Sequence, residues 1–493
     1  MFVLQQIHAA AEATPGKLAL VHNGAPVTYS AFWRWIVACR DSLAPLLPRS
    51  GVAALWVDNL LDAWVLALAL KSLGLDTLSV RQPEEATGAD AACLIAVVGQ
   101  AAREAPPGLP HLTIAPPSRV PLDLARPLPP LPEAPARFGG QVSLTSGTTG
   151  RYKMVLRHYG QDPAALRERL AHYEDLGPEF RALNADTVMC VFDFGLWTAG
   201  GHSWPILIWS LQGAVVLGQT GPMHQALRWP GITHGLATPY ILNRLMEAPE
   251  GGLPHLPGMQ LIILSGAVSD GLARQVMARL TPRLLINLSS TEAGGWARSL
   301  VTRPEDLRWY RVDANRRVEV VDEADRPVPN GQLGRIRVSL RADNARGYVG
   351  DAATSAQMFR GDWFYPGDLG MLNADGRLAV MGRTTDVVSI AGEKYPAEPW
   401  ERAIQDRLGC EGVCLVSGDW DGAGERLCVF IEARQPPAAT EIAGALQDIL
   451  AGFAEAQAYV VQALPRTPNG KVKRLELAQR LRDGVYKLGP GAR

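Results

Sequence analysis

The sequence predicts an α/β protein, and three observations carry this prediction. Short apolar strand-like runs alternate with helical patterns over most of the 493 residues, an order typical of parallel sheets covered by helices. Short alternating strands with turn signals follow, and a third region mixes helices and strands. We therefore expect a large N-terminal domain of stacked βα sheets with a β-rich subdomain, and a small, mobile α+β C-terminal domain.

The first strand–helix–strand unit lies near the N-terminus. Residues 51–57 are predicted as a buried strand, residues 60–74 as a helix rich in Leu and Ala, and residues 77–80 as the next strand. Such a unit is the building block of a parallel sheet. The same pattern recurs at three apolar runs, residues 214–217, 261–264 and 284–286.

Composition marks the connections between the expected domains. Residues 101–140 hold 11 of the 37 prolines, and because proline fixes φ and removes a backbone donor, we expect an extended surface connector there. The β-rich subdomain is expected at about residues 310–382. A change of pattern after Gly382 predicts an N-terminal domain of residues 1–382 and a C-terminal domain of residues 383–493.

The overall composition excludes several classes of protein. The chain has 48 Lys and Arg against 49 Asp and Glu, which gives no reason to expect nucleic acid as the main partner. No apolar run exceeds eight residues, so no membrane span and no secretory leader is expected. The six cysteines form no C-x-x-C pair, which favours reduced, buried thiols in a cytoplasmic protein.

A segment rich in glycine and hydroxyl groups follows the predicted strand at residues 141–144. It reads Thr145-Ser146-Gly147-Thr148-Thr149-Gly150, and Lys153 lies three residues further on. Glycines let the backbone approach an anion, hydroxyls donate to phosphate oxygens, and the lysine supplies compensating charge. The segment therefore predicts a phosphate-binding loop, although a solvated polar loop has the same composition.

This loop resembles the phosphate-binding signature of the adenylate-forming superfamily, which includes acyl-CoA synthetases, luciferases and the adenylation domains of peptide synthetases. Four later segments are similar to that family's remaining motifs and occur in the family's order: residues 287–292, 365–370, 382–386 (continuing to residues 392–394) and 464–471. The resemblance covers almost the whole chain. It implies that a carboxylate attacks the α-phosphorus of ATP, giving an acyl-adenylate and pyrophosphate.

The resemblance also implies roles in nucleotide binding. Glu292 corresponds to a Mg²⁺ ligand, which suits a carboxylate, and Thr291 beside it to a phosphate donor. A glutamate in the first turn of a helix is the structural alternative for Glu292. The family's nucleotide contacts fall at Asn287, Leu288 and Ser289.

Two further pairs correspond to contacts with the nucleoside. Asp368 is expected to accept hydrogen bonds from both ribose hydroxyls, with Arg383 as a second ribose contact. Gly266 and Ala267 are expected to bring backbone against the adenine. A turn aspartate and a surface arginine are the structural alternatives for the first pair.

Lys471 corresponds to the catalytic cation, a mobile ammonium that bridges the carboxylate and the α-phosphate. The alternative is a solvated basic run, because Lys473 and Arg474 follow it. Thr385 falls at the hinge, where the family usually has an acidic residue or lysine. Tyr152 and Pro399 replace a usual proline and glutamate, and Leu288-Ser289 replace Tyr-Gly, so the chain is expected to be a divergent member.

The acid-binding residues are the least determined by the sequence. Phe192-Asp193 resembles a pair that holds the substrate ammonium in amino-acid-activating relatives, whereas a helix cap is the alternative for Asp193. Trp197 and Trp296 are candidates for the wall of the pocket, although tryptophan is more often a core residue.

The expected function is an AMP-forming ligase of a small carboxylic acid, an enzyme that uses ATP and Mg²⁺ and passes the acyl group to coenzyme A. Two alternatives remain open. The first is a stand-alone adenylation enzyme that loads an amino acid or acyl group onto a carrier-protein phosphopantetheine. The second is a nucleotide-binding homologue without turnover, suggested by Leu288, Ser289 and Thr385.

Overall fold

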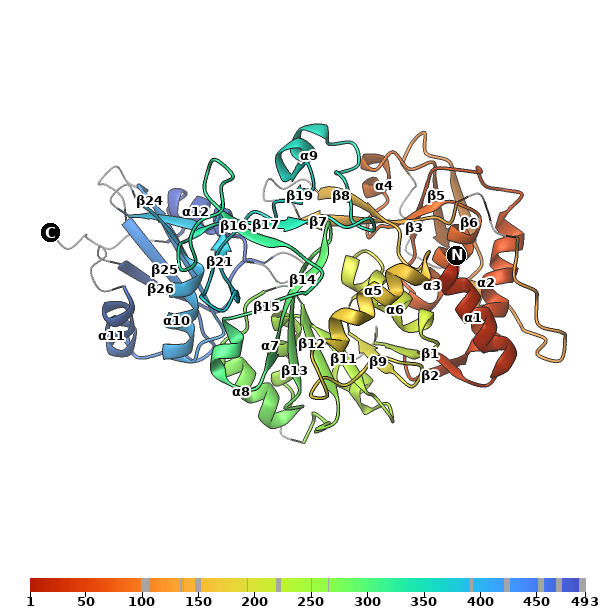
Figure 1. Ribbon diagram of the computed structural model, residues 1–493, viewed down its shortest axis with the longest axis horizontal. Coiled ribbons are helices and arrows are strands. Elements are labelled where there is room, and N and C mark those ends of the chain that lie inside the picture. Colours follow the sequence, from red (N-terminus) through yellow and green to blue (C-terminus); the bar gives the residue numbers. More distant parts are fainter. Residues whose placement is uncertain are drawn as a thin grey trace.

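The structure is a computed structural model with two large, mostly parallel sheets. An antiparallel sheet of strands β16 to β21 (residues 318–383), which we call the β-rich sheet, and a C-terminal α+β unit follow them. The N-terminal elements lie at one end of the long axis and the C-terminal elements at the other, with the β-rich sheet between them (Figure 1). This arrangement confirms the predicted α/β class. The structure describes residues 1–98, 106–133, 135, 137–146, 152–192, 194–218, 223–249, 251–264, 266–390, 393–420, 426–450, 456–466 and 472–486.

The first large sheet has the order β6-β5-β3-β4-β7-β8, and its strands are parallel except for β8. Helix α3 is apolar around its whole circumference, which explains why it is buried along its entire length. The elements of this unit are β3 (Val52–Trp56), α3 (Leu60–Ser72), β4 (Asp76–Ser79), α4 (Glu84–Gly88), β5 (Cys93–Val97), β6 (His111–Ile114), a 3₁₀ turn (Pro117–Arg119), β7 (Gln141–Ser146) and β8 (Tyr152–Arg157).

The proline-rich stretch contributes an edge strand in addition to extended chain. Strand β6 is free of proline and pairs in parallel with β5. Two indole nitrogens of α2 hold the chain that follows, because Trp35 donates to the carbonyl of Val120 over 3.1 Å and Trp33 to that of Pro129 over 2.8 Å. These hydrogen bonds give donors to backbone carbonyls of a proline-rich segment that forms no strand at these positions.

The second large sheet has the order β15-β14-β13-β12-β11-β9-β10-β1-β2 and a parallel centre from β13 to β1. Its strands are β1 (Leu18–His22), β2 (Ala25–Thr28), β9 (Val188–Val191), β10 (Ala214–Leu217), β11 (His234–Ala237), β12 (Gln260–Leu264), β13 (Leu284–Ser290), β14 (Gly294–Val301) and β15 (Arg311–Val312). The accompanying helices are α1 (Phe2–Ala13), α2 (Tyr29–Leu43), α5 (Pro163–Glu174), α6 (Ala199–Ser210), α7 (Pro239–Met246) and α8 (Asp270–Arg279), with 3₁₀ turns at Met223–Arg228 and Pro304–Leu307.

A β-rich sheet follows, in the region where the sequence predicts short strands. Its order is β18-β19-β17-β20-β21, and β16 also pairs with β17. The elements are β16 (Val318–Val321), β17 (Gly334–Ser339), α9 (Ala352–Met358), β18 (Phe359–Arg360), β19 (Trp363–Phe364), β20 (Asp368–Leu372) and β21 (Leu378–Arg383).

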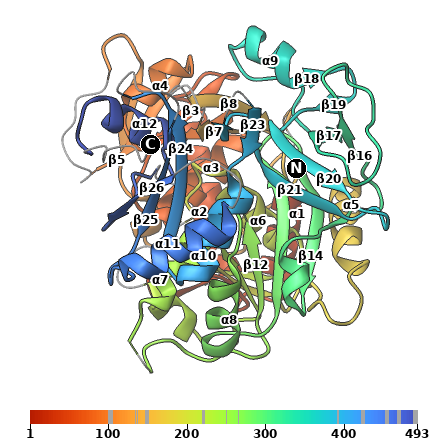
Figure 2. The ribbon, with the colours of Figure 1, turned by 90° about the vertical axis from the view of Figure 1, so that its left-hand side faces the viewer.

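The C-terminal unit contains a two-stranded sheet, β22-β23, and a three-stranded sheet, β24-β25-β26. The three-stranded sheet has a separate apolar core on each face. Val413 and Leu415 of β24 pack with residues of α10 and α11, whereas Cys414 and Val416 pack with residues of α12, as the alternation of a strand requires. Figure 2 shows this unit from its outer side. Its elements are β22 (Val387–Ile390), β23 (Glu393–Pro396), α10 (Glu398–Leu408), β24 (Gly412–Gly418), β25 (Arg426–Glu432), α11 (Ala439–Ile449), β26 (Ala456–Val461) and α12 (Arg474–Arg482).

Polar contacts join this unit to the rest of the protein. The backbone N–H of Asp270, at the start of α8, donates to Oδ1 of Asp406 in α10 over 2.9 Å. Arg434 forms an exposed ion pair with Glu247. Across the described residues, every helix is too short or too polar to cross a membrane.

A buried lysine fixes the strand that leads into the glycine-rich loop. The side chain of Lys71 is 1% exposed. Its ammonium donates to the carbonyl of Gly140 over 2.6 Å, to Oε1 of Gln141 over 3.0 Å and to the hydroxyl of Thr77. These contacts tie the end of α3 and strand β4 to the start of β7. Burial lowers the pKa of Lys71 from 10.5 to about 7, against the opposing effect of Asp76.

The buried amine predicts a pH dependence of stability. Between about pH 7 and pH 10 the unfolded chain holds a proton on Lys71 that the folded chain has released. The unfolded state therefore binds more protons, and the free energy of unfolding rises with pH across this window. Lys71→Met removes this contribution, so chemical denaturation at pH 7 and pH 9 is expected to show a steeper rise for the natural protein than for the variant.

Lys17→Met is the control, because the ammonium of Lys17 lies at the surface and donates to the carbonyl of Ala185. This control is expected to keep the slope of the natural protein. Equal slopes for the natural protein and Lys71→Met would contradict the assignment.

Candidate active site

A cavity of about 470 Å³ lies at the carboxyl ends of the parallel strands in the second sheet. Residues at or just beyond the ends of five strands line it, which are Phe194 after β9, Gly218 after β10, Thr238 after β11, Leu264 of β12 and Ser290 of β13. Thr145 near the end of β7 also lines it, so both large sheets contribute. Ligands of open α/β sheets bind at this edge.

The candidate metal ligand and the lysine of the phosphate-loop segment meet at one tyrosine. The ammonium of Lys153 lies 5.0 Å from the ring centroid of Tyr348, and the Tyr348 hydroxyl donates to Oε1 of Glu292 over 2.9 Å. Burial and the charge of Glu292 raise the pKa of Tyr348 above its ordinary value, so the phenol stays a neutral donor. Strand β8 places Lys153 opposite Thr145 in the β7–β8 ladder.

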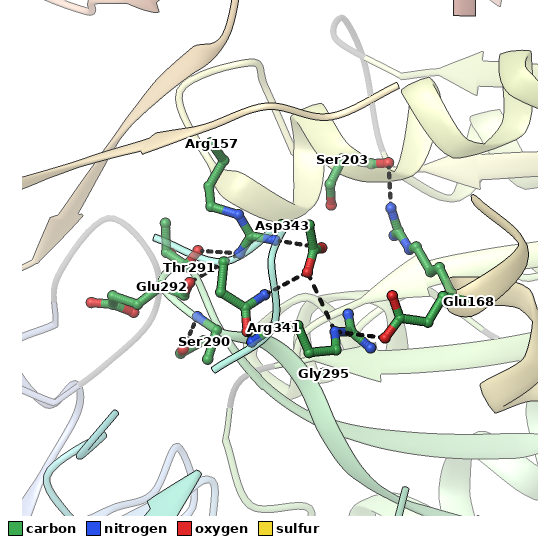
Figure 3. A network of polar contacts seen from close by, with 12 residues as sticks. Arg157, Glu168, Ser203, Ser290, Thr291, Glu292, Gly295, Arg341 and Asp343 are labelled. Carbon is green, nitrogen blue, oxygen red and sulfur yellow. Dashed lines mark hydrogen bonds and ion pairs between the residues drawn. The ribbon is translucent and has the colours of Figure 1, made fainter. Parts of the chain in front are cut away.

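Glu292 lies in the tight connection between β13 and β14, and its side chain is buried. This position excludes the alternative of a glutamate in the first turn of a helix. The guanidinium of Arg157 donates to the carbonyls of Thr291 and Glu292 over 3.0 and 3.1 Å (Figure 3). The N–H of Ala345 also donates to the Glu292 carbonyl. The backbone of this turn is therefore fixed from two other segments.

Strand β13 directs its side chains alternately. Asn287 and Ser289 line the cavity, and Oδ1 of Asn287 accepts a hydrogen bond from Nε of Arg298 over 3.0 Å. Leu288 packs against the apolar core of the second sheet. Thr291, predicted as a phosphate donor, lines the cavity as well.

The two residues predicted to bind ribose form an ion pair. Asp368 and Arg383 are opposite one another in the β20–β21 ladder, and Nε of Arg383 lies 2.9 Å from Oδ1 of Asp368. Arg383 also donates to the carbonyl of Pro366 over 2.6 Å. Just beyond it, Thr385 is exposed and its hydroxyl donates to Asp386 over 3.2 Å.

The predicted adenine segment has the close packing that its small residues allow. Gly266 has φ +125°, which favours glycine, and a Cβ there would lie 3.4 Å from Cγ of Pro239 at the start of α7. Ala267 follows it and is partly exposed.

The structure separates the candidates for the acid pocket. Trp197 lines the cavity, whereas Phe192 and Trp296 are buried in the core of the second sheet and are not among the residues that line it. Helix α6 is capped by Thr198, whose side chain accepts from the N–H of Gly201 over 2.9 Å, so the cap expected at Asp193 belongs to Thr198.

Several predicted site residues lie outside the described residues. These are Gly147, Thr148, Thr149, Gly150, Asp193 and Lys471, and at Ser146 only the backbone is described. Their roles stay predictions.

Sequence reasoning missed the arginines of this cavity. Arg157, Arg169, Arg298 and Arg341 all line it. The sequence did contain one signal of these residues. Arg157 ends one predominantly apolar strand and Arg298 lies within another, and a charged residue in an apolar strand indicates a buried ion pair or a binding site.

A cavity at the carboxyl ends of parallel strands, lined by Thr145 and by Thr291 next to the buried Glu292, is typical of nucleotide-binding α/β enzymes. A model of the AMP-binding enzyme family matches residues 100–349, slightly more than half of the sequence. The chain therefore belongs to the AMP-binding enzymes, and the resemblance to the adenylate-forming superfamily is confirmed.

Two curated relatives show the range of this similarity. Salicylyl-CoA synthase / salicylate adenylyltransferase from Streptomyces sp is 29% identical over 371 residues, covering 69% of this chain and 62% of the relative. The fatty acid–[acyl-carrier-protein] ligase ScoC from Streptomyces coeruleorubidus is 26% identical over 351 residues, covering 68% and 66%. The match thus spans less than two thirds of either relative.

Solved structures show the same fold along nearly the whole chain. ATP-bound MatB from Rhodopseudomonas palustris has a TM-score of 0.80 at 19% identity, covering 98% of this chain and 100% of MatB. The amide bond synthetase McbA from Marinactinospora thermotolerans has a TM-score of 0.77 at 20% identity, covering 97% and 98%.

The Asp368–Arg383 pair predicts a specific defect in nucleotide binding. Asp368→Ala is expected to raise the KM for ATP by about 10- to 100-fold, because hydrogen bonds to a charged group contribute about 1.5–3 kcal/mol. The measurement is the rate of ATP-dependent pyrophosphate release against ATP concentration. Asp375→Ala is the control, since Asp375 is an exposed residue in the turn between the same two strands. A similar KM in all three proteins would disprove the ribose role.

Proposed function

We propose that the protein activates a small carboxylic acid with ATP and Mg²⁺, releases pyrophosphate and passes the acyl group to the thiol of coenzyme A. The single observation that carries this proposal is the contact series from Lys153 through Tyr348 to Glu292, whose neighbours Thr145 (across the ladder from Lys153) and Thr291 line the strand-end cavity. It brings a cation and a carboxylate from distant segments to the end of the phosphate-loop strand.

The residues around Glu292 fit a magnesium ion. Magnesium prefers hard oxygen ligands and usually takes one or two carboxylates together with substrate phosphates, so one glutamate beside a phosphate loop suffices. The ion would neutralise charge on the phosphates of ATP. Tyr348 orients the Glu292 carboxylate by donating to one of its oxygens, and Thr145 and Thr291 line the space where phosphate oxygens would lie.

Attack by a carboxylate on a phosphate joins two anionic reactants, so catalysis depends on positioning and charge compensation. Asp368 and Arg383 hold the ribose in this proposal, and Gly266 leaves room for the adenine. Lys471 bridges the carboxylate and the α-phosphate as negative charge shifts to the pyrophosphate.

Thiol transfer requires the C-terminal unit to turn about the segment at Thr385. The polar character of the contacts at Asp406 and Arg434 supports this motion, because such contacts exchange with water without exposing apolar surface. The six cysteines are free thiols, which supports a cytoplasmic location as part of the same proposal.

The relatives favour one second candidate for the acceptor. A fatty acid–[acyl-carrier-protein] ligase is among them, so a carrier-protein phosphopantetheine is the alternative to coenzyme A. Incubating the protein with ATP, a labelled acid and either coenzyme A or a phosphopantetheinylated carrier separates these acceptors by which product takes up the label.

Exchange of labelled pyrophosphate into ATP tests the activation step itself. Exchange that depends on an acid, across a panel of aryl and alkyl acids, is the expected result. Complete absence of exchange would favour the remaining alternative, a nucleotide-binding homologue without turnover.

Lys471 yields the most direct mutational prediction. Lys471→Ala is expected to lower the rate of acid-dependent pyrophosphate exchange by about 100-fold or more, because it removes charge needed in the transition state, while ATP still binds. Lys473→Ala is the matched control from the same segment, since Lys473 is about half exposed and pairs with Glu476 over 3.4 Å. An unchanged exchange rate in Lys471→Ala would refute its catalytic role.

A further inference from the structure

One end of the cavity carries more positive charge than the proposed reaction uses. Arg157, Arg169, Arg298 and Arg341 line this region, which we call the arginine end. They come from four segments distant in sequence: β8, α5, β14 and the chain after β17. Figure 3 shows Glu292 on one side, Ser203 and Glu168 on the other, and Asp343 and Arg341 between them. The arginine end thus extends away from the proposed metal ligand.

Carboxylates compensate only part of this charge. Asp343 lies 3.2 Å from Arg157 and 3.3 Å from Arg341, measured between the nearest nitrogen and oxygen atoms. Asp313 pairs with Arg298 over 3.1 Å, and Glu168 lies 3.4 Å from Arg341. Among these three carboxylates, only Asp343 lines the cavity itself.

Arg169 has neutral partners in the described structure. Its Nη1 donates to the carbonyl of Ser203 over 3.0 Å, and its guanidinium carbon lies 5.0 Å from the centre of the Trp204 ring. Burial lowers the pKa of Arg169 and Arg157 acts in the same direction, yet a guanidinium stays protonated in proteins. A partly buried cation with these partners calls for an anion.

Arg298 adds a second fixed cation to the arginine end. Its side chain is 3% exposed, its Nε donates to Asn287 and its Nη2 forms an ion pair with Asp313, whereas its Nη1 has no hydrogen-bond partner among the described residues. The guanidinium is held in place by Asn287, Asp313 and the ring of Tyr173, whose centre is 4.2 Å away. The guanidinium therefore places a fixed positive charge at the wall of the cavity, with Asp313 as its charged partner.

The histidine between these arginines adds no charge. Arg341 can only donate, so Nε2 of His172 accepts the hydrogen bond over 2.6 Å and the ring proton lies on Nδ1, which faces Asp313 at 3.7 Å. Burial and the surrounding arginines lower the pKa of His172 to about 3. The ring is therefore neutral at neutral pH, and the region keeps its positive excess.

Resting on the proposed function, we infer that the arginine end binds a second anionic group of the acid, so that the substrate is a dicarboxylate with a flat carbon skeleton. The reacting carboxylate lies toward Thr291, and the second one lies between Arg169 and Arg298. Tyr173 and Trp204 also line the cavity beside these arginines, and aromatic lining suits a planar skeleton.

Matched acids test this inference. The comparison sets benzoate against its three benzenedicarboxylate isomers, and hexanoate against hexanedioate, by kcat/KM for pyrophosphate release. At least one dicarboxylate is expected to exceed its monocarboxylate partner by 10-fold or more, since charge-assisted hydrogen bonds give about 10- to 150-fold. Monocarboxylates that react as well as every dicarboxylate would overturn the inference.

Arg169→Met locates the effect, because methionine keeps the apolar contact with Trp204 and removes the charge. The preference for the dicarboxylate is expected to fall by about 10-fold, and Arg169→Lys is expected to retain part of it. Arg167→Met is the matched control, since Arg167 is exposed on the same helix and should leave the preference unchanged. An increase in the KM for ATP instead of the acid would assign Arg169 to the phosphates and overturn the inference.

Equilibrium binding keeps this test separate from the test of turnover. Calorimetric titration of the protein with the dicarboxylates, without ATP, is expected to show binding that Arg169→Met weakens. Such binding without pyrophosphate release would support the arginine end and refute the proposed function. Release of pyrophosphate with no preference between the acids would support the function and refute the arginine end.

Discussion

The buried guanidinium of Arg157 is the interaction on which the site depends. It projects from the end of β8, in the first sheet, and donates to the backbone of the β13–β14 turn, in the second sheet. The same group pairs with Asp343. Arg157 is 3% exposed, so its loss would leave the Thr291 carbonyl without its donor and would remove one of the partners of the Glu292 carbonyl and of Asp343. One side chain thus fixes the distance between the two halves of the site.

In the proposed reaction, the glycine-rich segment and Glu292 can bind the same nucleotide only if the distance between the two sheets is maintained. Glu292 follows a strand of a sheet that does not pair with the strands flanking the loop, so no strand ladder between the two sheets sets its position. Tyr348 adds a second link, because its ring lies near Lys153 and its hydroxyl reaches Glu292. The β-rich sheet contributes separately, because its β20–β21 ladder sets Asp368 against Arg383 beside the C-terminal unit.

Sequence reasoning identified the fold class because apolar periodicity is a local property. Glycines and hydroxyl groups pointed to the segment that carries Thr145, and the resemblance to the adenylate-forming superfamily pointed to the segments that carry Glu292 and Asp368. Sequence reasoning failed to distinguish Trp197, which faces the cavity, from Trp296, which lies in the core. Both are aromatic residues near motifs, and only packing decides which surface they meet.

The sequence by itself determined the βα order, the β-rich region and the family to which the chain belongs, because these follow from local pattern and motif order. Only the tertiary structure decided which side chains line the cavity. Arg169, Arg298 and Arg341 are far apart in the sequence, and none belongs to a recognisable motif. They share one end of a cavity because α5, β14 and the chain after β17 converge there. The electrostatic character of a pocket depends on such long-range convergence, which no local pattern records.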